Sequence, residues 1–111
     1  MPTPSYKNRV GVASATTGTG TQTLGATESG YQGFAAGDDG KLFDVVIEDG
    51  TAWEVARDCL YTHSGTTLSR GTLEASSTGS ALSLTGSQKI YVTETAERIS
   101  RDAIALGAIT P

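Results

Sequence analysis

The chain has 111 residues, of which 37% are hydrophobic and 18% charged, and a formal net charge of −4. That length allows one domain with a core, and it is short for a core plus a separate catalytic lobe. Only eight residues are basic and they are scattered, which argues against a nucleic-acid partner, because such binding needs a basic face.

No stretch of about 18 apolar residues occurs, and the start MPTPSYKNR lacks the apolar core of a signal peptide. We therefore expect no membrane partner and synthesis in the cytoplasm. The single cysteine, Cys59, cannot form an internal disulfide, which fits that compartment.

Residues 1–7 contain Pro2 and Pro4 and are predicted to form an extended arm. The arm is either a frayed terminus or a segment that becomes ordered on a neighbour, and Tyr6 is its candidate contact residue. Two short strands follow, over Arg9–Ala13 and Thr21–Leu24, separated by a turn of sequence ATTGTG. This turn is not a dinucleotide fingerprint, since G-x-G-x-x-G requires glycine where the chain has Thr23.

The stretch from Lys41 to Ser69 reads as a β-meander. Apolar residues alternate with others from Phe43 to Ile47, as in a strand with one buried face. Asp49-Gly50 is a typical hairpin turn. Trp53 and Val55 continue into a return strand, and we expect the Trp53 side chain to lie in the core.

Two groups of polar residues are candidates for a metal site or a catalytic site. Asp38 and Asp39, with Asp44, Glu48 and Asp49, could form an acidic end of the meander that binds calcium, but the EF-hand pattern is missing and these residue types are common in turns. Cys59 and His63 supply only two soft ligands, too few for zinc, and have no visible orienting group for nucleophilic catalysis. We expect a buried cysteine, an exposed turn histidine and no cofactor.

Further strands are expected between Arg70 and Thr93, at intervals of roughly ten residues with Gly/Ser/Thr turns between them. The predicted fold class is therefore all-β, a small antiparallel β-sandwich or partly closed barrel. The predicted core consists of Val10, Val12, Leu24, Phe34, Phe43, Val45, Ile47, Trp53, Val55, Leu68, Leu73, Leu84, Ile90 and Val92.

After Thr93 the composition changes. Residues 95–106 contain good helix formers, and Gly107 is placed like a helix stop. Ile99, Ala103 and Leu106 would share one face, which either packs on the same domain or docks on another subunit. The predicted organisation is an arm over 1–7, a β domain over 8–94 and a helix-like or extended docking tail over 95–111.

Three stretches together resemble a small β domain of tailed-bacteriophage virion proteins, tail-fibre-like proteins among them. They are NRVGVASATTGTGTQTLGATESGYQGF, IEDGTAWEVARDCLYTHSGTTLSRGTLEASSTGSALSLTG and KIYVTET. The ordered set T-G-T-G-T, G-Y-x-x-F, I-E-D-G-x-x-W-E-V, G-T-T-L-S-R and A-S-S carries the resemblance. The chain departs from that group at Ala56-Arg57-Asp58-Cys59, where the group is glycine-rich, and in its helix-like tail.

The resemblance implies a noncatalytic structural component of a bacteriophage virion, present in multiple copies at the tail, neck or fibre attachment. Its partners would be other virion proteins and copies of itself, as a trimer or larger homo-oligomer, with no small-molecule substrate. Two alternatives stay open: a capsid decoration protein, and a receptor- or glycan-binding module that would use exposed aromatic residues such as Trp53, Tyr61 or Tyr91.

Overall fold

The computed structural model describes residues 3–93, and the expected C-terminal tail with Ile99, Ala103 and Leu106 lies outside them. The described chain is all-β, as predicted. Its elements are β1 (Thr3–Pro4), β2 (Gly11–Ser14), β3 (Gln22–Thr27), a 3-10 turn η1 (Ala36–Asp38), β4 (Lys41–Asp49), β5 (Ala52–Thr62), β6 (Thr67–Leu68), β7 (Thr72–Ser76) and β8 (Gln88–Val92).

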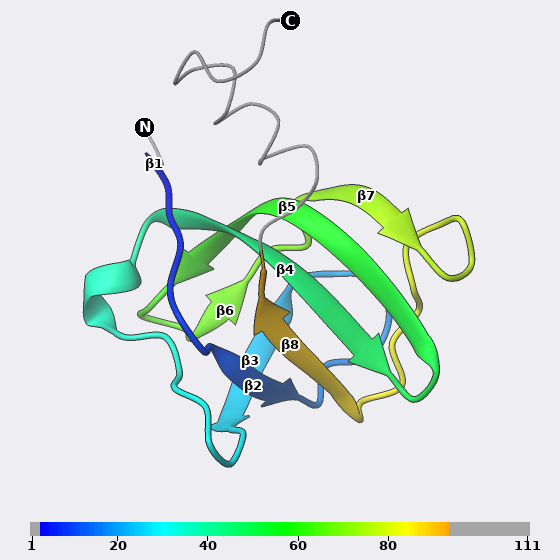
Figure 1. The fold of residues 1–111 in the computed structure, drawn as a ribbon, viewed down its shortest axis with the longest axis horizontal. Helices are drawn as coiled ribbons and strands as arrows, with labels where there is room; N and C mark the ends of the chain where they lie inside the picture. Colours follow the sequence, from blue (N-terminus) through cyan, green and yellow to red (C-terminus); the bar gives the residue numbers. More distant parts are fainter. Residues whose placement is uncertain (1–2, 94–111) are drawn as a thin grey trace, which may run out of the picture.

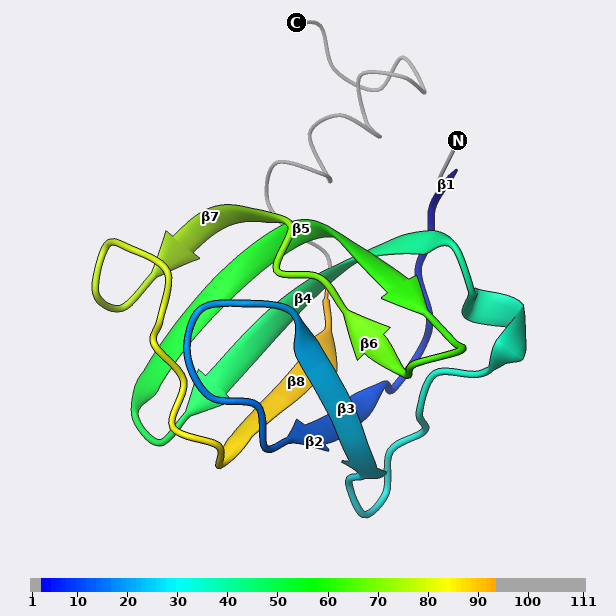
Figure 2. The ribbon, with the colours of Figure 1, turned by 180° about the vertical axis from the view of Figure 1, so that it is seen from behind.

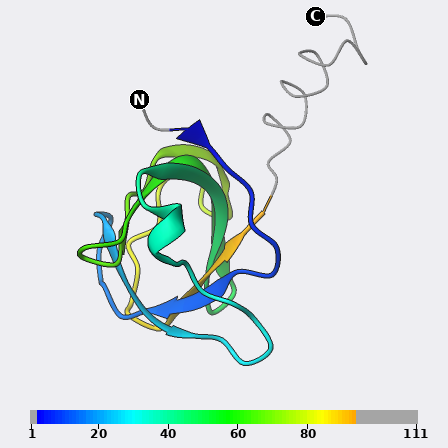
Figure 3. The same ribbon diagram turned by 90° about the vertical axis from the view of Figure 1, so that its left-hand side faces the viewer.

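The strands form one sheet that closes on itself as a partly closed barrel (Figures 1 and 2). The ring runs β4-β8-β2-β3-β6-β5, and β5 returns to β4, with every neighbouring pair antiparallel. In the end-on view of Figure 3, η1 lies across the near end of this ring. Closing the ring leaves few unpaired strand edges.

Two strands lie outside the ring. β1 pairs in parallel with Lys41–Leu42 of β4, ahead of the part of β4 that pairs with β8. β7 pairs with the first half of β5, whereas β6 pairs with its end. The predicted arm is thus, over its described part, held on its own barrel, where Ser5 N donates to Leu42 O at 2.8 Å and Lys7 Nζ lies 2.7 Å from Asp38 Oδ2.

The hairpin predicted from Asp49-Gly50 joins β4 and β5, and Gly50 has the positive φ of 66° that such a turn requires. β5 then contains a bulge at Arg57–Asp58, where the pairing with β4 slips between Phe43 and Val45. Asp58 has a φ of 58°, and Asp44 Oδ1 accepts a hydrogen bond from its amide.

Most of the predicted core lies inside the barrel. Val10, Val12, Phe43, Val45, Ile47, Leu68, Leu84 and Ile90 are buried, and Leu24, Phe34 and Val92 pack on them while partly exposed. Leu82 is buried as well, although residues 81–87 form no strand and contribute only an isolated bridge from Leu84 to Gly18. Phe34 stacks on Tyr61 at 4.7 Å between ring centroids.

Candidate interaction surface

A row of small and apolar side chains crosses the outside of the barrel. The strand register places Val46 opposite both Val55 and Tyr91, and Val55 opposite Ala75, so these side chains stand on one face of four neighbouring strands. Ala75 is exposed and the other three are half-buried. We call these four residues the outer row: Ala75 (β7), Val55 (β5), Val46 (β4) and Tyr91 (β8).

One end of the outer row is extended by Tyr31. Its ring lies 5.3 Å from that of Tyr91, and both rings pack over Gly11, where an added Cβ would come within 2.8 Å of Tyr31. Only glycine therefore lets the two tyrosines approach the backbone of β2 this closely. The guanidinium of Arg9 stacks on the outer side of Tyr31, 4.4 Å from the ring centroid.

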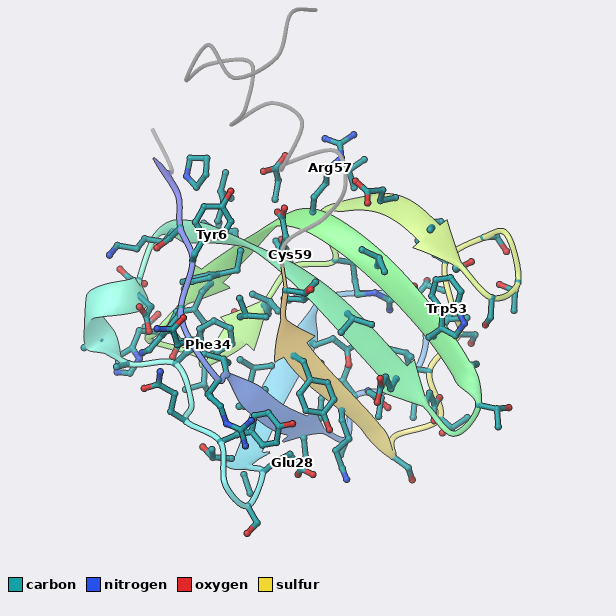
Figure 4. The ribbon with its side chains drawn as sticks, in the orientation of Figure 1. Tyr6, Glu28, Phe34, Trp53, Arg57 and Cys59 are labelled. Atoms are coloured by element: carbon teal, nitrogen blue, oxygen red, sulfur yellow. The ribbon has the colours of Figure 1, made fainter. Side chains whose placement is uncertain are left out.

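Trp53 lies beside the other end of the row, close to the β4–β5 turn (Figure 4). Its side chain is 41% exposed, so the prediction that it belongs to the core is wrong. It stands opposite Glu48 of β4 on the outer face. Its backbone amide donates to Ser77 Oγ at 3.1 Å, which ties the strand to the β7–β8 connection.

The bulge in β5 explains this error. After the bulge the odd-numbered residues Cys59 and Tyr61 point inward and are buried. Burial was predicted for Cys59, whereas Tyr61 was expected as an exposed aromatic, and that expectation is wrong. Before it the even-numbered residues Glu54 and Ala56 point inward, and Trp53 and Val55 point outward, since one extra residue exchanges the two faces of a strand. Val55 is accordingly half-buried in the outer row rather than in the core, and Leu73 of β7 is only half-buried.

Two hollows beside the outer row join into one groove. The first, of about 410 Å³, lies between the tyrosines and Val46, and the second, of about 270 Å³, runs along residues 6–9. Both are lined by Arg9, Val92 and Thr93, so we call them together the tyrosine groove. The groove contains Tyr6, a predicted contact residue, which is 46% exposed.

The walls of the tyrosine groove carry charged as well as aromatic side chains, since Arg9, Glu48 and Lys7 line it. Burial, and after it the carboxylates of Glu48 and Glu28, raise the pKa of Tyr91, so its phenol stays protonated at neutral pH. Lys89, at the edge of the same face, is bound by Glu28 at 3.0 Å. A surface that combines aromatic rings with a few charged side chains suits a protein or carbohydrate partner.

Polar side chains also fill one end of the barrel interior, and each has partners. Glu54, 1% exposed, forms a two-point ion pair with Arg70, at 2.7 Å to Nη2 and 3.0 Å to Nε, and also accepts from Leu82 N at 2.9 Å. Gln88 Nε2 donates to Gln22 Oε1 at 2.6 Å. This polar interior cluster, which the sequence analysis did not anticipate, fastens the loops to the barrel.

The acidic residues considered for calcium are not gathered at one end. Asp38 and Asp49 lie at opposite ends of β4, on the order of 25 Å apart at the usual strand rise. Asp38 binds Lys7, whereas Asp49 accepts from both the amide and the hydroxyl of Thr85. Within residues 3–93 no group of three or more His, Cys, Asp or Glu is arranged to hold a metal ion.

Cys59 and His63 lie in different environments, one buried and one exposed. Cys59 is fully buried, and burial, with smaller contributions from nearby carboxylates, raises its pKa to about 12, which keeps the thiol protonated and unreactive. His63 lies in the exposed turn that was predicted, where its Nδ1 is 2.8 Å from the hydroxyl of Tyr61.

Comparisons with protein-family models, with curated proteins and with solved structures gave no significant match. Among the described residues 3–93, no helix has the length and hydropathy needed to cross a membrane.

Proposed function

We propose that this chain is a noncatalytic structural subunit of a bacteriophage particle, present in several copies at the tail, neck or fibre attachment. The observation that carries the binding role is the outer face of the barrel. There the outer row lies between two large exposed aromatics, Trp53 at 41% and Tyr31 at 38%. Apolar surface of this kind on a folded domain is typical of a contact with another molecule.

The phage assignment draws on the sequence resemblance, and the fold gives those motifs a consistent physical meaning. The motif I-E-D-G-x-x-W-E-V spans the β4–β5 hairpin and supplies both the outward Trp53 and the inward Glu54. The motif G-T-T-L-S-R supplies Arg70, which pairs with Glu54. Two separate parts of the resemblance therefore meet in one buried ion pair.

Quantitative mass spectrometry of purified particles tests this proposal. The chain should be present at a few to some tens of copies per particle. It should also stay with the tails when the heads are removed. A copy number close to that of the major capsid protein, with retention on heads, would instead favour capsid decoration. Absence from the particle would contradict both assignments.

A receptor- or glycan-binding role is a second candidate, and the exposure of Trp53 favours it. An exposed indole next to half-buried aliphatic residues can stack on the apolar face of a sugar ring. As the chain's only tryptophan, Trp53 reports such binding directly. Titration with host surface polysaccharide should shift or quench its fluorescence if this role holds, and an unchanged spectrum would count against it.

A further inference from the structure

We propose that the tyrosine groove of one copy binds the C-terminal segment, residues 95–106, of a neighbouring copy, so that copies join head to tail. This inference rests on the proposed assembly role and names the partner of the outer face. The groove supplies three tyrosine side chains, Tyr6, Tyr31 and Tyr91, next to Arg9. The segment supplies a predicted apolar stripe formed by Ile99, Ala103 and Leu106.

The chemistry of the segment suits this surface. Eighteen residues follow Thr93, since 111 − 93 = 18. Residues 95–106 would form about 18 Å of helix at 1.5 Å per residue, with Ile99, Ala103 and Leu106 on one side. Asp102 would lie beside that stripe, and Arg9 is the positive charge common to both hollows of the groove. Aromatic grooves that receive one face of an amphipathic helix are a common recognition mode.

The path of the chain favours a neighbour's groove over its own. β8 keeps its pairing to the end: Val92 N donates to Val10 O at 3.3 Å, and Thr93 N donates to Asp44 O at 2.9 Å. Thr93, the last described residue, therefore lies at the groove wall, and Tyr91 and Val46 lie behind it along the direction of β8. To lie on them, the tail would have to reverse at once, yet residues 94–98, ETAER, contain no Gly, Pro, Asn, Asp or Ser.

Head-to-tail contacts of this kind have one donor and one acceptor on each copy. They produce rings when the rotation between copies closes and filaments when it does not. Both outcomes give the multiple copies that the proposed function requires.

Mixing two complementary variants of the full chain tests the inference. Val46→Arg blocks the groove and leaves the tail intact, whereas the double variant Ile99→Asp/Leu106→Asp spoils the tail and leaves the groove intact. Each alone should be monomeric by native mass spectrometry and sedimentation. An equimolar mixture should form a heterodimer, because the unaltered tail of the Val46→Arg variant can bind the unaltered groove of the double variant. The wild type should associate further as its concentration rises.

Matched variants keep the result interpretable. Ser100→Asp/Ala105→Asp adds the same charge on other sides of the predicted helix, and Thr21→Arg adds a cation on an exposed loop; both should associate like the wild type. Tyr6→Asp, at an exposed groove position, provides a second block if Val46→Arg fails to fold. A mixture that stays monomeric, or association unchanged in the tail variant, would overturn the inference. If the protein were still found in purified particles, such a result would contradict this inference but not the proposed function.

Discussion

The two faces of β5 use opposite chemistry. Inward, Glu54 is 1% exposed and is bound by Arg70 and by the amide of Leu82. Outward, the adjacent Trp53 is 41% exposed, and Val55 is half-buried beside it. The buried polar group has its hydrogen bonds satisfied inside the fold, whereas the large outward side chains are covered only in part. The interior therefore determines stability, and the outer face is available for binding.

Removing the buried ion pair on the inward face of β5 should have the largest effect on stability. Glu54→Ala leaves the Arg70 guanidinium, whose side chain is 11% exposed, without its carboxylate. We expect a loss of about 3–5 kcal/mol in the free energy of unfolding, measured by urea titration.

The double variant Glu54→Met/Arg70→Met serves as the control, because replacing both partners by apolar side chains removes the unpaired charge. It should be clearly more stable than Glu54→Ala. If the single and double variants are equally destabilised, the ion pair is not the source of the loss.

The second prediction concerns the glutamine pair in the same interior cluster. Gln88 Nε2 donates to Gln22 Oε1 and to Thr16 O, and its Oε1 accepts from Gly86 N at 2.9 Å. Gln88→Ala leaves Thr16 O and Gly86 N without this partner, while Gln22 Oε1 keeps the hydrogen bond from Ser14 Oγ. The variant should lower the free energy of unfolding by about 2 kcal/mol. The amide of Gly86, which donates to Gln88 Oε1, should then exchange its hydrogen faster. Unchanged exchange there would contradict the proposed fastening of the loops.

A third, smaller effect is expected where residues 3–7 meet the barrel. Burial alone would raise the pKa of Asp38, but the hydrogen bonds from Lys7 and from Ala35 N outweigh it, so the pKa lies below its ordinary value of 3.8. Because the folded pKa is depressed, the carboxylate stabilises the fold above pH 3.8, and this contribution is lost as the pH falls through the folded pKa.

Asp38→Asn should therefore lower the free energy of unfolding by about 1 kcal/mol at neutral pH. The difference from the wild type should shrink as the pH drops below 3.8. Lys7→Ala should show the same pH dependence, because it removes the other member of the pair. Urea titrations between neutral and acid pH measure both variants, and a difference that persists in strong acid would contradict this account.

A substitution on the outward face of β5 should change the stability least. Trp53→Ser removes a side chain that is 41% exposed, and the expected change in the free energy of unfolding is within about 1 kcal/mol. Binding to particles or to polysaccharide should instead be strongly reduced. A loss of stability as large as that of Glu54→Ala would show that Trp53 acts as a core residue.

The sequence predicted the strands well where alternation and turn residues agree. The alternation from Phe43 to Ile47 and the Asp49-Gly50 turn gave the β4–β5 hairpin, and Val10, Leu84 and Ile90 are buried as expected. A partly closed barrel was one of two predicted architectures, since pairing between strands far apart in sequence decides between them and leaves no local signal.

The errors arise from two features that local patterns do not reveal. The bulge at Asp58 exchanges the faces of β5, and nothing in the alternation of residues marks it, so Trp53 and Val55 were placed inside. The pairing of Glu54 with Arg70 joins residues sixteen positions apart and requires the β5–β7 geometry. Tyr31 and Tyr91, from distant segments, meet over Gly11 for the same reason.

Hydroxyl-radical labelling of the free chain and of purified particles tests most directly whether the outer face is the binding surface. In the free chain Trp53 and Tyr31 should be oxidised readily, in keeping with their exposure of 41% and 38%. In the particle both should be protected, while His63, exposed in its turn near Asp39, should react equally in the two samples. Equal oxidation of Trp53 and Tyr31 in the two samples would contradict the assignment of this face as the interface.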